Sequence, residues 1–221
     1  QILKNTVNKV FGYVRTNGTL ACVPADQQPD GKGGDIWERK YVMLGLSQYY
    51  AHIEKDPRVL KLMIDEANSV IDQIGDAPKK DINSQGWSRT GIESYSVMEP
   101  MMRLYKLTGD KRYLDFCTYL IEKGGCRGAN IFQESLDNVR PRKMGNGYPK
   151  AYEMLSVYEG LAEYYRCTGD AKWEKAIMNL FENLKKYEIT IIGNGGADQP
   201  YFPKWRGEAW DDTALEQTNP K

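Results

Sequence analysis

The hydrophobic positions of this chain recur with the period of an α-helix. One apolar stripe contains Leu3, Val7, Val10, Phe11 and Val14, which is the spacing of one helix face. Similar stripes occur within residues 59–74, 113–121 and 173–184. Residues 36–53, 91–107 and 149–167 are apolar or small around more of their circumference. The pattern predicts four amphipathic outer helices and three more deeply buried inner helices.

The expected helices meet at turns with a recurring local chemistry. In each Thr-Gly-Asp sequence, Gly109 or Gly169 can end one helix in a left-handed conformation, and the following aspartate can cap the next helix. Asp56-Pro57 is a variant of the same junction, because proline suits the first helical position. The three aspartates lie 54 and 60 residues apart. A two-helix repeat of this length is typical of stacked αα-hairpins.

The repeat predicts an all-α protein, in which an array of αα-hairpins forms part of an (α/α)6 toroid. Closing six such hairpins into a ring needs on the order of 320 residues. Residues 1–221 are therefore expected to form a single, incomplete barrel domain. Two irregular stretches interrupt the helices, at residues 16–34 and 189–221. The second is expected to be an active-site loop or a tail.

Charge and cysteine content exclude several classes of function. Thirty basic and thirty acidic side chains give a net charge of zero, so neither nucleic acid nor a membrane is expected as a partner. Four cysteines without CxxC spacing and the single His52 make a closed metal site or a Ser-His-Asp triad improbable. No metal or cofactor is expected within these residues.

The last irregular stretch is rich in aromatic and acidic side chains. Tyr201, Phe202, Trp205 and Trp210 lie close to Glu208 in the sequence. Aromatic rings stack on the C–H faces of sugars, and carboxylates accept hydrogen bonds from sugar hydroxyls. Burial beside indole rings also keeps a carboxyl protonated, as a general acid requires. The composition favours a sugar ligand with Trp210 as a substrate contact, and Glu208 has the surroundings of a general acid, with an ordinary loop carboxylate as the alternative.

Several longer strings carry a resemblance to a known family. SYSVMEPMMRLYKLTGDKRYLDF, KAYEMLSVYEGLAEYYRCTGD and ITIIGNGGADQ followed by RGEAW are similar to the β-L-arabinofuranosidase-type enzymes of glycoside hydrolase family 127. The resemblance implies an (α/α)6 barrel and a retaining mechanism with a zinc-held cysteine nucleophile. It also implies a glutamate acid/base in a Gly-Glu motif, which Gly207-Glu208 matches. The expected activity is removal of a terminal, arabinofuranoside-like sugar from plant-type glycans.

The family resemblance also bears on metal and substrate contacts. The zinc motif and the nucleophilic cysteine are expected after Lys221, so residues 1–221 alone are expected to be inactive and to depend on the remainder of the polypeptide. The positions that match the family's sugar-binding histidines hold Tyr41, Ser94 and Lys150, which are expected to contact substrate. The family further implies a periplasmic or extracellular location.

Three glutamates occupy equivalent places in the repeat. Glu38, Glu93 and Glu153 each lie 17 or 18 residues before a capping aspartate, which would bring three acids to one mouth of the barrel. Glu38 and Glu93 also have the spacing of a capping box, which is a structural alternative. Trp37 and Trp87 precede inner helices and could form a stacking platform. Glu99 is expected to pair with Arg103 inside a buried helix.

Two other functions remain open at this point. A helical array without a nucleophile could be a non-catalytic scaffold that binds a protein or peptide on its concave face. Another sugar enzyme on the same barrel, such as an unsaturated glucuronyl hydrolase or an epimerase, is also conceivable. A single histidine disfavours the epimerase, and glutamates in place of an aspartate disfavour the glucuronyl hydrolase. Exposed ends of an incomplete barrel predict self-association.

Overall fold

The computed structural model describes residues 1–20, 35–147, 150–190, 193, 195 and 210. The first half contains α1 (Ile2–Val10), α2 (Asp35–His52), α3 (Pro57–Gln73), α4 (Ile92–Tyr95), α5 (Met98–Thr108) and α6 (Lys111–Glu122). The second half contains β1 (Gly125–Cys126), β2 (Ala129–Asn130), α7 (Ile131–Leu136), α8 (Ala151–Thr168) and α9 (Ala171–Tyr187). Short 3₁₀ helices lie at Phe11–Tyr13, Ile82–Ser84 and Pro141–Lys143. This order confirms the all-α class.

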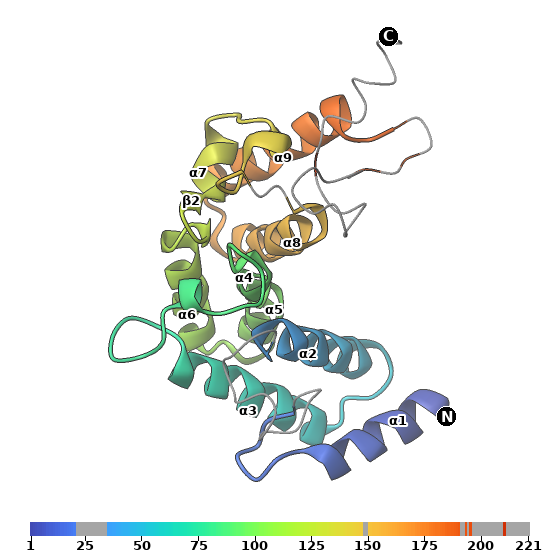
Figure 1. Ribbon diagram of the computed structural model, residues 1–221. Coiled ribbons are helices and arrows are strands. Elements are labelled where there is room, and N and C mark those ends of the chain that lie inside the picture. The colour runs from blue at the N-terminus through green and yellow to red at the C-terminus, as the bar shows by residue number, and fades with distance from the viewer. Residues whose placement is uncertain (21–34, 148–149, 191–192, 194, 196–209, 211–221) are drawn as a thin grey trace.

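The helices form two layers (Figure 1). Each inner helix is followed by an outer one, so α2 pairs with α3, α5 with α6 and α8 with α9. The inner helices α2, α5 and α8 lie side by side, and α4 packs against both α2 and α8. The two strands form a small antiparallel hairpin after α6, with Gly125 opposite Asn130, and α7 packs on α9. This is the predicted array of αα-hairpins.

The Thr-Gly-Asp turns have the predicted geometry. Gly109 and Gly169 end α5 and α8 with φ values of 72° and 69°, a conformation that favours glycine. Asp110 caps α6 by accepting a hydrogen bond from the Arg112 N–H at 3.0 Å. Asp170 caps α9 in the same way, and Asp56 caps α3 ahead of Pro57. Local sequence therefore determines all three helix-to-helix junctions.

One prediction of helix continuity is wrong. Residues 91–107 do not form one inner helix, because the chain turns at residues 96–97 between α4 and α5. Pro100 lies in the first turn of α5. In a continuous helix its ring would clash with the carbonyl group of residue 96, and that carbonyl would have no N–H donor because proline lacks one. The Ser96 hydroxyl instead donates to the Glu93 carbonyl at 2.6 Å. Proline chemistry thus divides the central inner helix into two.

The core lies between the two layers and is built largely from Leu, Ile, Val, Met and Tyr side chains. The first and last helices nevertheless leave apolar side chains in solvent: Ile2 and Leu3 on α1, and Met178 and Phe181 on α9. Self-association through these ends remains a prediction. None of the described helices combines the length and apolar character that crossing a membrane requires. Most of residues 189–221, including Glu208, lies outside the described part of the chain.

Candidate functional site

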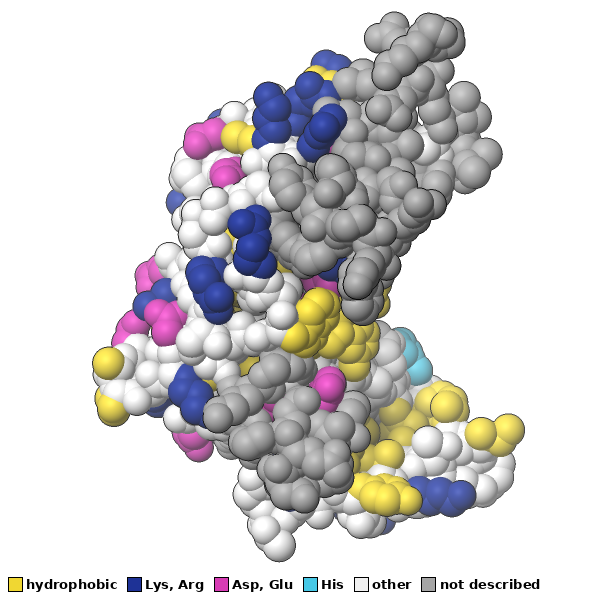
Figure 2. Space-filling model, in the orientation of Figure 1, with side chains coloured by type: hydrophobic (Ala, Val, Ile, Leu, Met, Phe, Trp, Pro, Cys, Tyr) yellow, Lys and Arg dark blue, Asp and Glu magenta, His cyan; other side chains and the backbone are white. Residues whose placement is uncertain are grey.

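An exposed surface runs along the inner helices, on the side away from their outer partners. We call it the inner face and define it by Tyr41 and Gly45 of α2 and by Tyr152, Leu155 and Glu159 of α8, which are all exposed. In Figure 2, hydrophobic side chains gather over α2 on the side toward α8. The other sides of α2 and α8 pack against neighbouring helices, so the inner face is the surface that these two helices offer to a ligand.

Three aromatic side chains meet at the start of the inner face. The Tyr41 and Tyr152 hydroxyls form a hydrogen bond of 2.5 Å that joins α2 to α8. The Trp37 ring packs edge-on against both tyrosines, with ring centroids 5.1 and 5.6 Å away. We call Trp37, Tyr41 and Tyr152 the aromatic platform, and its partly exposed rings suit the C–H face of a sugar.

A group of charged side chains lies next to this platform. The Lys40 ammonium lies 4.9 Å from the centre of the Trp37 ring and 4.2 Å from that of Tyr41. On α5, Glu99 forms the predicted ion pair with Arg103, with an N–O distance of 2.9 Å. Glu159 of α8 lies within the electrostatic reach of these groups. Aromatic rings, a donor and an acceptor are therefore brought together from three inner helices.

Burial shifts the pKa values of the groups at the inner face. Loss of water lowers the pKa of Lys40, although Glu99 and Glu159 partly oppose this shift. Burial raises the pKa of Glu159, and the negative charge of Glu99 raises it further. Burial raises the pKa of the Tyr41 hydroxyl, and the hydrogen bond between Tyr41 and Tyr152 raises it further. The Tyr41 phenol therefore stays protonated.

The three equivalent glutamates do not share one environment. Glu93 is fully buried and accepts hydrogen bonds from the Trp87 N–H at 2.5 Å and the Ser88 N–H at 2.8 Å. It therefore holds the loop before α4, and α4 is capped by Gly91 instead of a Thr90–Glu93 capping box. Glu153 is buried and pairs with Lys150 at 3.2 Å. Glu38 is partly buried in the first turn of α2.

The other predicted contacts are spread over several places. Trp87 is half exposed in the loop before α4, and Ser94 is buried within α4. Trp210 is buried in the core, close to Gly195. Glu208 lies outside the described residues. Among the predicted site residues, the structure brings Trp37 and Tyr41 together, and it adds Tyr152, Lys40 and Glu159 to them.

The sequence contained one signal for Lys40. Ile36, Lys40 and Met43 recur at i, i+4 and i+7 and are all buried, so a lysine interrupts an apolar stripe. No comparable feature of the sequence indicated that Tyr152 would lie at the site.

A polar cavity lies elsewhere, on the outer helix α3. Its volume is about 530 Å³, and it is lined by the turn at residues 16–18 and by polar side chains of α3 that include Asp65, Asn68 and Asp72. None of its described lining residues is aromatic, so these residues do not provide the stacking surface that the inner face offers.

Comparison with known proteins identifies the family. A family model described as β-L-arabinofuranosidase, GH127 catalytic domain, matches residues 3–214. The chain belongs to this family. Among curated proteins, none matches the GH127 chain.

Solved structures support the fold of this GH127 chain. A GH127 β-L-arabinofuranosidase from Geobacillus stearothermophilus T6 matches with a TM-score of 0.63 and 17% identity, covering 88% of this chain and 33% of that enzyme. A second GH127 β-arabinofuranosidase matches with a TM-score of 0.55 and 21% identity, covering 80% of this chain and 26% of the other. A D-mannose isomerase matches with a TM-score of 0.60 and 11% identity, over 97% of this chain and 62% of the isomerase. The GH127 chain thus spans about a quarter to a third of the two arabinofuranosidases.

Proposed function

We propose that this chain supplies the sugar-binding inner face of a glycoside hydrolase that removes a terminal, arabinofuranoside-like sugar from plant-type glycans. The observation that supports the proposal is the aromatic platform, in which two phenol hydroxyls and partly exposed rings meet at the start of α2 and α8. Such a surface offers stacking and hydrogen bonds together, which is how proteins recognise sugars. Membership of the GH127 family supports the choice of reaction.

The proposal is tested with the protein that carries this chain and a panel of p-nitrophenyl glycosides. We expect turnover of the arabinofuranoside above that of other sugars. Replacing Tyr152 by Leu should raise KM by a few-fold to about tenfold, the value of one aromatic contact. Tyr165→Leu is the matched control, because Tyr165 of the same helix lies near Glu174 of the outer helix α9, whose carboxylate raises the Tyr165 pKa. Absence of turnover with every sugar would favour the non-catalytic scaffold.

We propose Glu208 as the general acid/base, on the basis of its Gly-Glu motif and its aromatic sequence neighbours. Glu208→Gln should reduce turnover by about 10²- to 10⁴-fold for substrates with poor leaving groups. Activated aryl leaving groups need less protonation and should be affected less. Glu208→Gln with normal rates on every leaving group, combined with an inactive Glu153→Gln, would place the acid/base on α8 instead.

The family resemblance also implies zinc, a cysteine nucleophile and a retaining mechanism. The described residues do not fit a zinc site, because no three His, Cys, Asp or Glu side chains among them are grouped as ligands. Their thiols are poor nucleophiles, since burial raises the pKa of Cys117 and raises that of Cys126 to about 12. We therefore derive no step through zinc from these residues. A periplasmic or extracellular location is part of the same proposal.

A further inference from the structure

The loop at residues 86–91 leads into α4 and carries the exposed side chain of Trp87. This tryptophan is 54% exposed, and its indole forms no hydrogen bond or ring contact with another described residue. The other described tryptophans are used by the fold, since Trp37 and Trp173 pack against neighbouring rings and Trp210 is buried. Trp87 is therefore a large aromatic group that faces solvent from a loop.

A buried carboxylate holds the main chain of this loop. Glu93 is fully buried, and its Oε1 accepts hydrogen bonds from the main-chain N–H groups of Trp87 at 2.5 Å and Ser88 at 2.8 Å. Its Oε2 accepts a third bond from the Ser88 hydroxyl, and that hydroxyl accepts one from the Gly91 N–H at 3.0 Å. Gly86 has a φ of 90°, and a Cβ there would overlap the Glu93 carboxylate. The buried carboxylate and the path of the loop therefore depend on each other.

A second anchor comes from the β-hairpin. The Arg127 guanidinium donates to the Asn83 carbonyl at 2.6 Å and to the Arg89 carbonyl at 3.3 Å. The main-chain N–H of Arg127 donates to the Thr90 carbonyl at 2.8 Å. These contacts, like those of the carboxylate to the N–H groups, fix main-chain atoms on both sides of Trp87. The loop is thus held in one path while the indole is left free.

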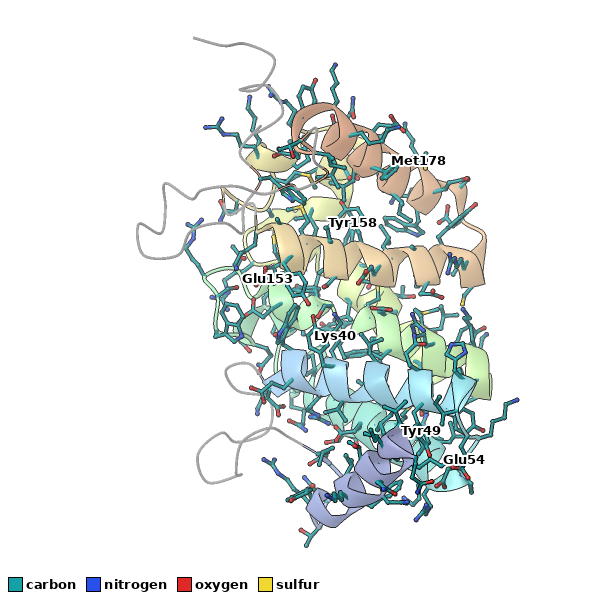
Figure 3. All side chains as sticks on the ribbon, turned by 90° about the vertical axis from the view of Figure 1, so that its right-hand side faces the viewer. Lys40, Tyr49, Glu54, Glu153, Tyr158 and Met178 are labelled. Carbon is teal, nitrogen blue, oxygen red and sulfur yellow. The ribbon has the colours of Figure 1, made fainter. Side chains whose placement is uncertain are left out.

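The loop lies at the same end of the inner helices as the aromatic platform. In Figure 3, Lys40 of α2 and Glu153 of α8 lie toward the same end of the two helices, which therefore run in the same direction. The outer helix α3 returns the chain to the end where α2 begins, and the loop and α4 follow there. Since α4 packs against both α2 and α8, Trp87 and the platform border the same end of the helical array.

We propose that Trp87 stacks on the glycan unit next to the terminal sugar, and that Glu93 is the positioning residue that fixes Trp87 for this contact. An indole face suits the C–H face of a sugar ring, and a loop that is ordered before binding avoids the entropy cost of ordering it with the ligand. The inference rests on the proposed sugar-binding function and adds to it a preference for glycans of two or more units. The sugar is favoured over a protein ligand because the platform borders the same end of the array.

The test compares initial rates of the protein that carries this chain on a single glycoside and on disaccharides. The probes are methyl β-L-arabinofuranoside and three methyl disaccharides that link this sugar to position 2, 3 or 5 of a second arabinose. At least one disaccharide should have a lower KM than the single glycoside. Trp87→Ala should raise the KM of that disaccharide by about 3- to 10-fold, with kcat unchanged and both constants of the single glycoside unchanged. Phe181→Ala, which removes an exposed ring from the outer helix α9, is the matched control and should change neither substrate.

The positioning role of Glu93 is tested through its dependence on Trp87. Glu93→Gln should raise the KM of the same disaccharide and leave the single glycoside unchanged. In the double variant Glu93→Gln/Trp87→Ala the two effects should not add, because Glu93 acts on the ligand only through the indole. The exposed Arg127 provides a second variant, and Arg127→Met should have the same selective effect even where Glu93→Gln lowers stability too far.

The outcomes separate this inference from the proposed function. An unchanged disaccharide KM in Trp87→Ala, together with a raised KM in Tyr152→Leu, would overturn the inference and leave the proposed function standing. Additive effects of Glu93→Gln and Trp87→Ala, or equal effects on both substrates, would overturn the positioning role. Absence of turnover with every one of these substrates would overturn the proposed function as well.

Discussion

Arg39 and Lys40 are neighbours in α2, and both are buried cations, but they face different parts of the molecule. Arg39 lies at the seam between α2 and α3. Its guanidinium donates to the Glu66 carboxylate at 2.7 Å, to the Glu66 carbonyl at 2.9 Å and to Asp35 at 3.4 Å. Glu66 also accepts a hydrogen bond from the Leu20 N–H, which ties the first irregular stretch to the seam. All the donors and acceptors of this network belong to the protein.

Lys40 lies on a different side of α2, where it meets aromatic rings and is influenced by the more distant carboxylates of Glu99 in α5 and Glu159 in α8. A buried charge is costly unless hydrogen bonds and a counter-charge surround it. Arg39 satisfies that requirement with described groups, whereas Lys40 forms no ion pair or hydrogen bond with any of the described residues. The comparison teaches that one side of α2 holds its buried cation with carboxylates of the fold, whereas the other side holds its cation against aromatic rings.

The largest expected effect is at the seam. Arg39→Met should lower the free energy of unfolding by about 3–5 kcal/mol, because it removes the cation that pairs with the buried Glu66 carboxylate. Urea denaturation of the two variants Arg39→Met and Lys40→Met measures the difference directly. Equal losses of stability in both variants would show that Arg39 and Lys40 contribute alike to folding, which contradicts the distinction between the two sides of α2.

A smaller loss is expected where α8 crosses α5. A Cβ atom at Gly160 would lie 2.7 Å from Met98 Cβ and 2.9 Å from the backbone nitrogen of Glu99. Gly160→Ala should therefore cost about 1–3 kcal/mol through overpacking, even though alanine favours a helix. The displacement of α8 would also change the field of Glu99 at Glu159. Thermal unfolding measures the cost, and a stability gain would mean that the helices are not in close contact.

The pH dependence of stability sharpens the comparison further. Burial raises the pKa of Glu66 above its ordinary value of 4.5, although Arg39 partly opposes the shift. The folded state therefore holds this proton more tightly than the unfolded chain does. The stability that this carboxyl contributes is complete below its unfolded pKa and is lost as the pH rises through its folded pKa. Between pH 4 and 7, the thermal midpoint of Glu66→Gln should fall less steeply with pH than that of the unsubstituted protein. Identical slopes for the two proteins would contradict the raised pKa of Glu66.

The fold could be predicted because its signals are local. Helical periodicity and the capping chemistry of Asp56, Asp110 and Asp170 act within a few residues, and the structure reproduces all three junctions. The break between α4 and α5 also has a local cause in Pro100. It was missed because the apolar pattern continues across it. Proline position should therefore outweigh hydrophobic periodicity when an inner helix is assigned.

The site was harder to predict because it depends on contacts between helices. Trp37 and Tyr41 were found from one helix, but their partner Tyr152 comes from another helix more than 100 residues later, and no spacing reveals such a contact. Glu93 was grouped with Glu38 by the repeat, yet its carboxylate is used by the N–H groups of the loop before α4. A repeat predicts which backbone positions are equivalent. The contacts of each side chain depend instead on the residues that pack around it.

The smallest effect is expected at Gly45, which lies on the inner face one turn beyond Tyr41. No atom outside its own helix and chain neighbours lies within 4 Å of a Cβ built at this position, so alanine meets open space there. Glycine within a helix costs about 0.5–1 kcal/mol relative to alanine. Gly45→Ala should therefore raise the free energy of unfolding by that amount, in contrast to Gly160→Ala in α8. Urea denaturation tests this contrast, and a loss of stability in Gly45→Ala would show that the backbone at this position needs glycine. A gain, together with weaker sugar binding, would mean that Gly45 is retained on the inner face at the expense of stability.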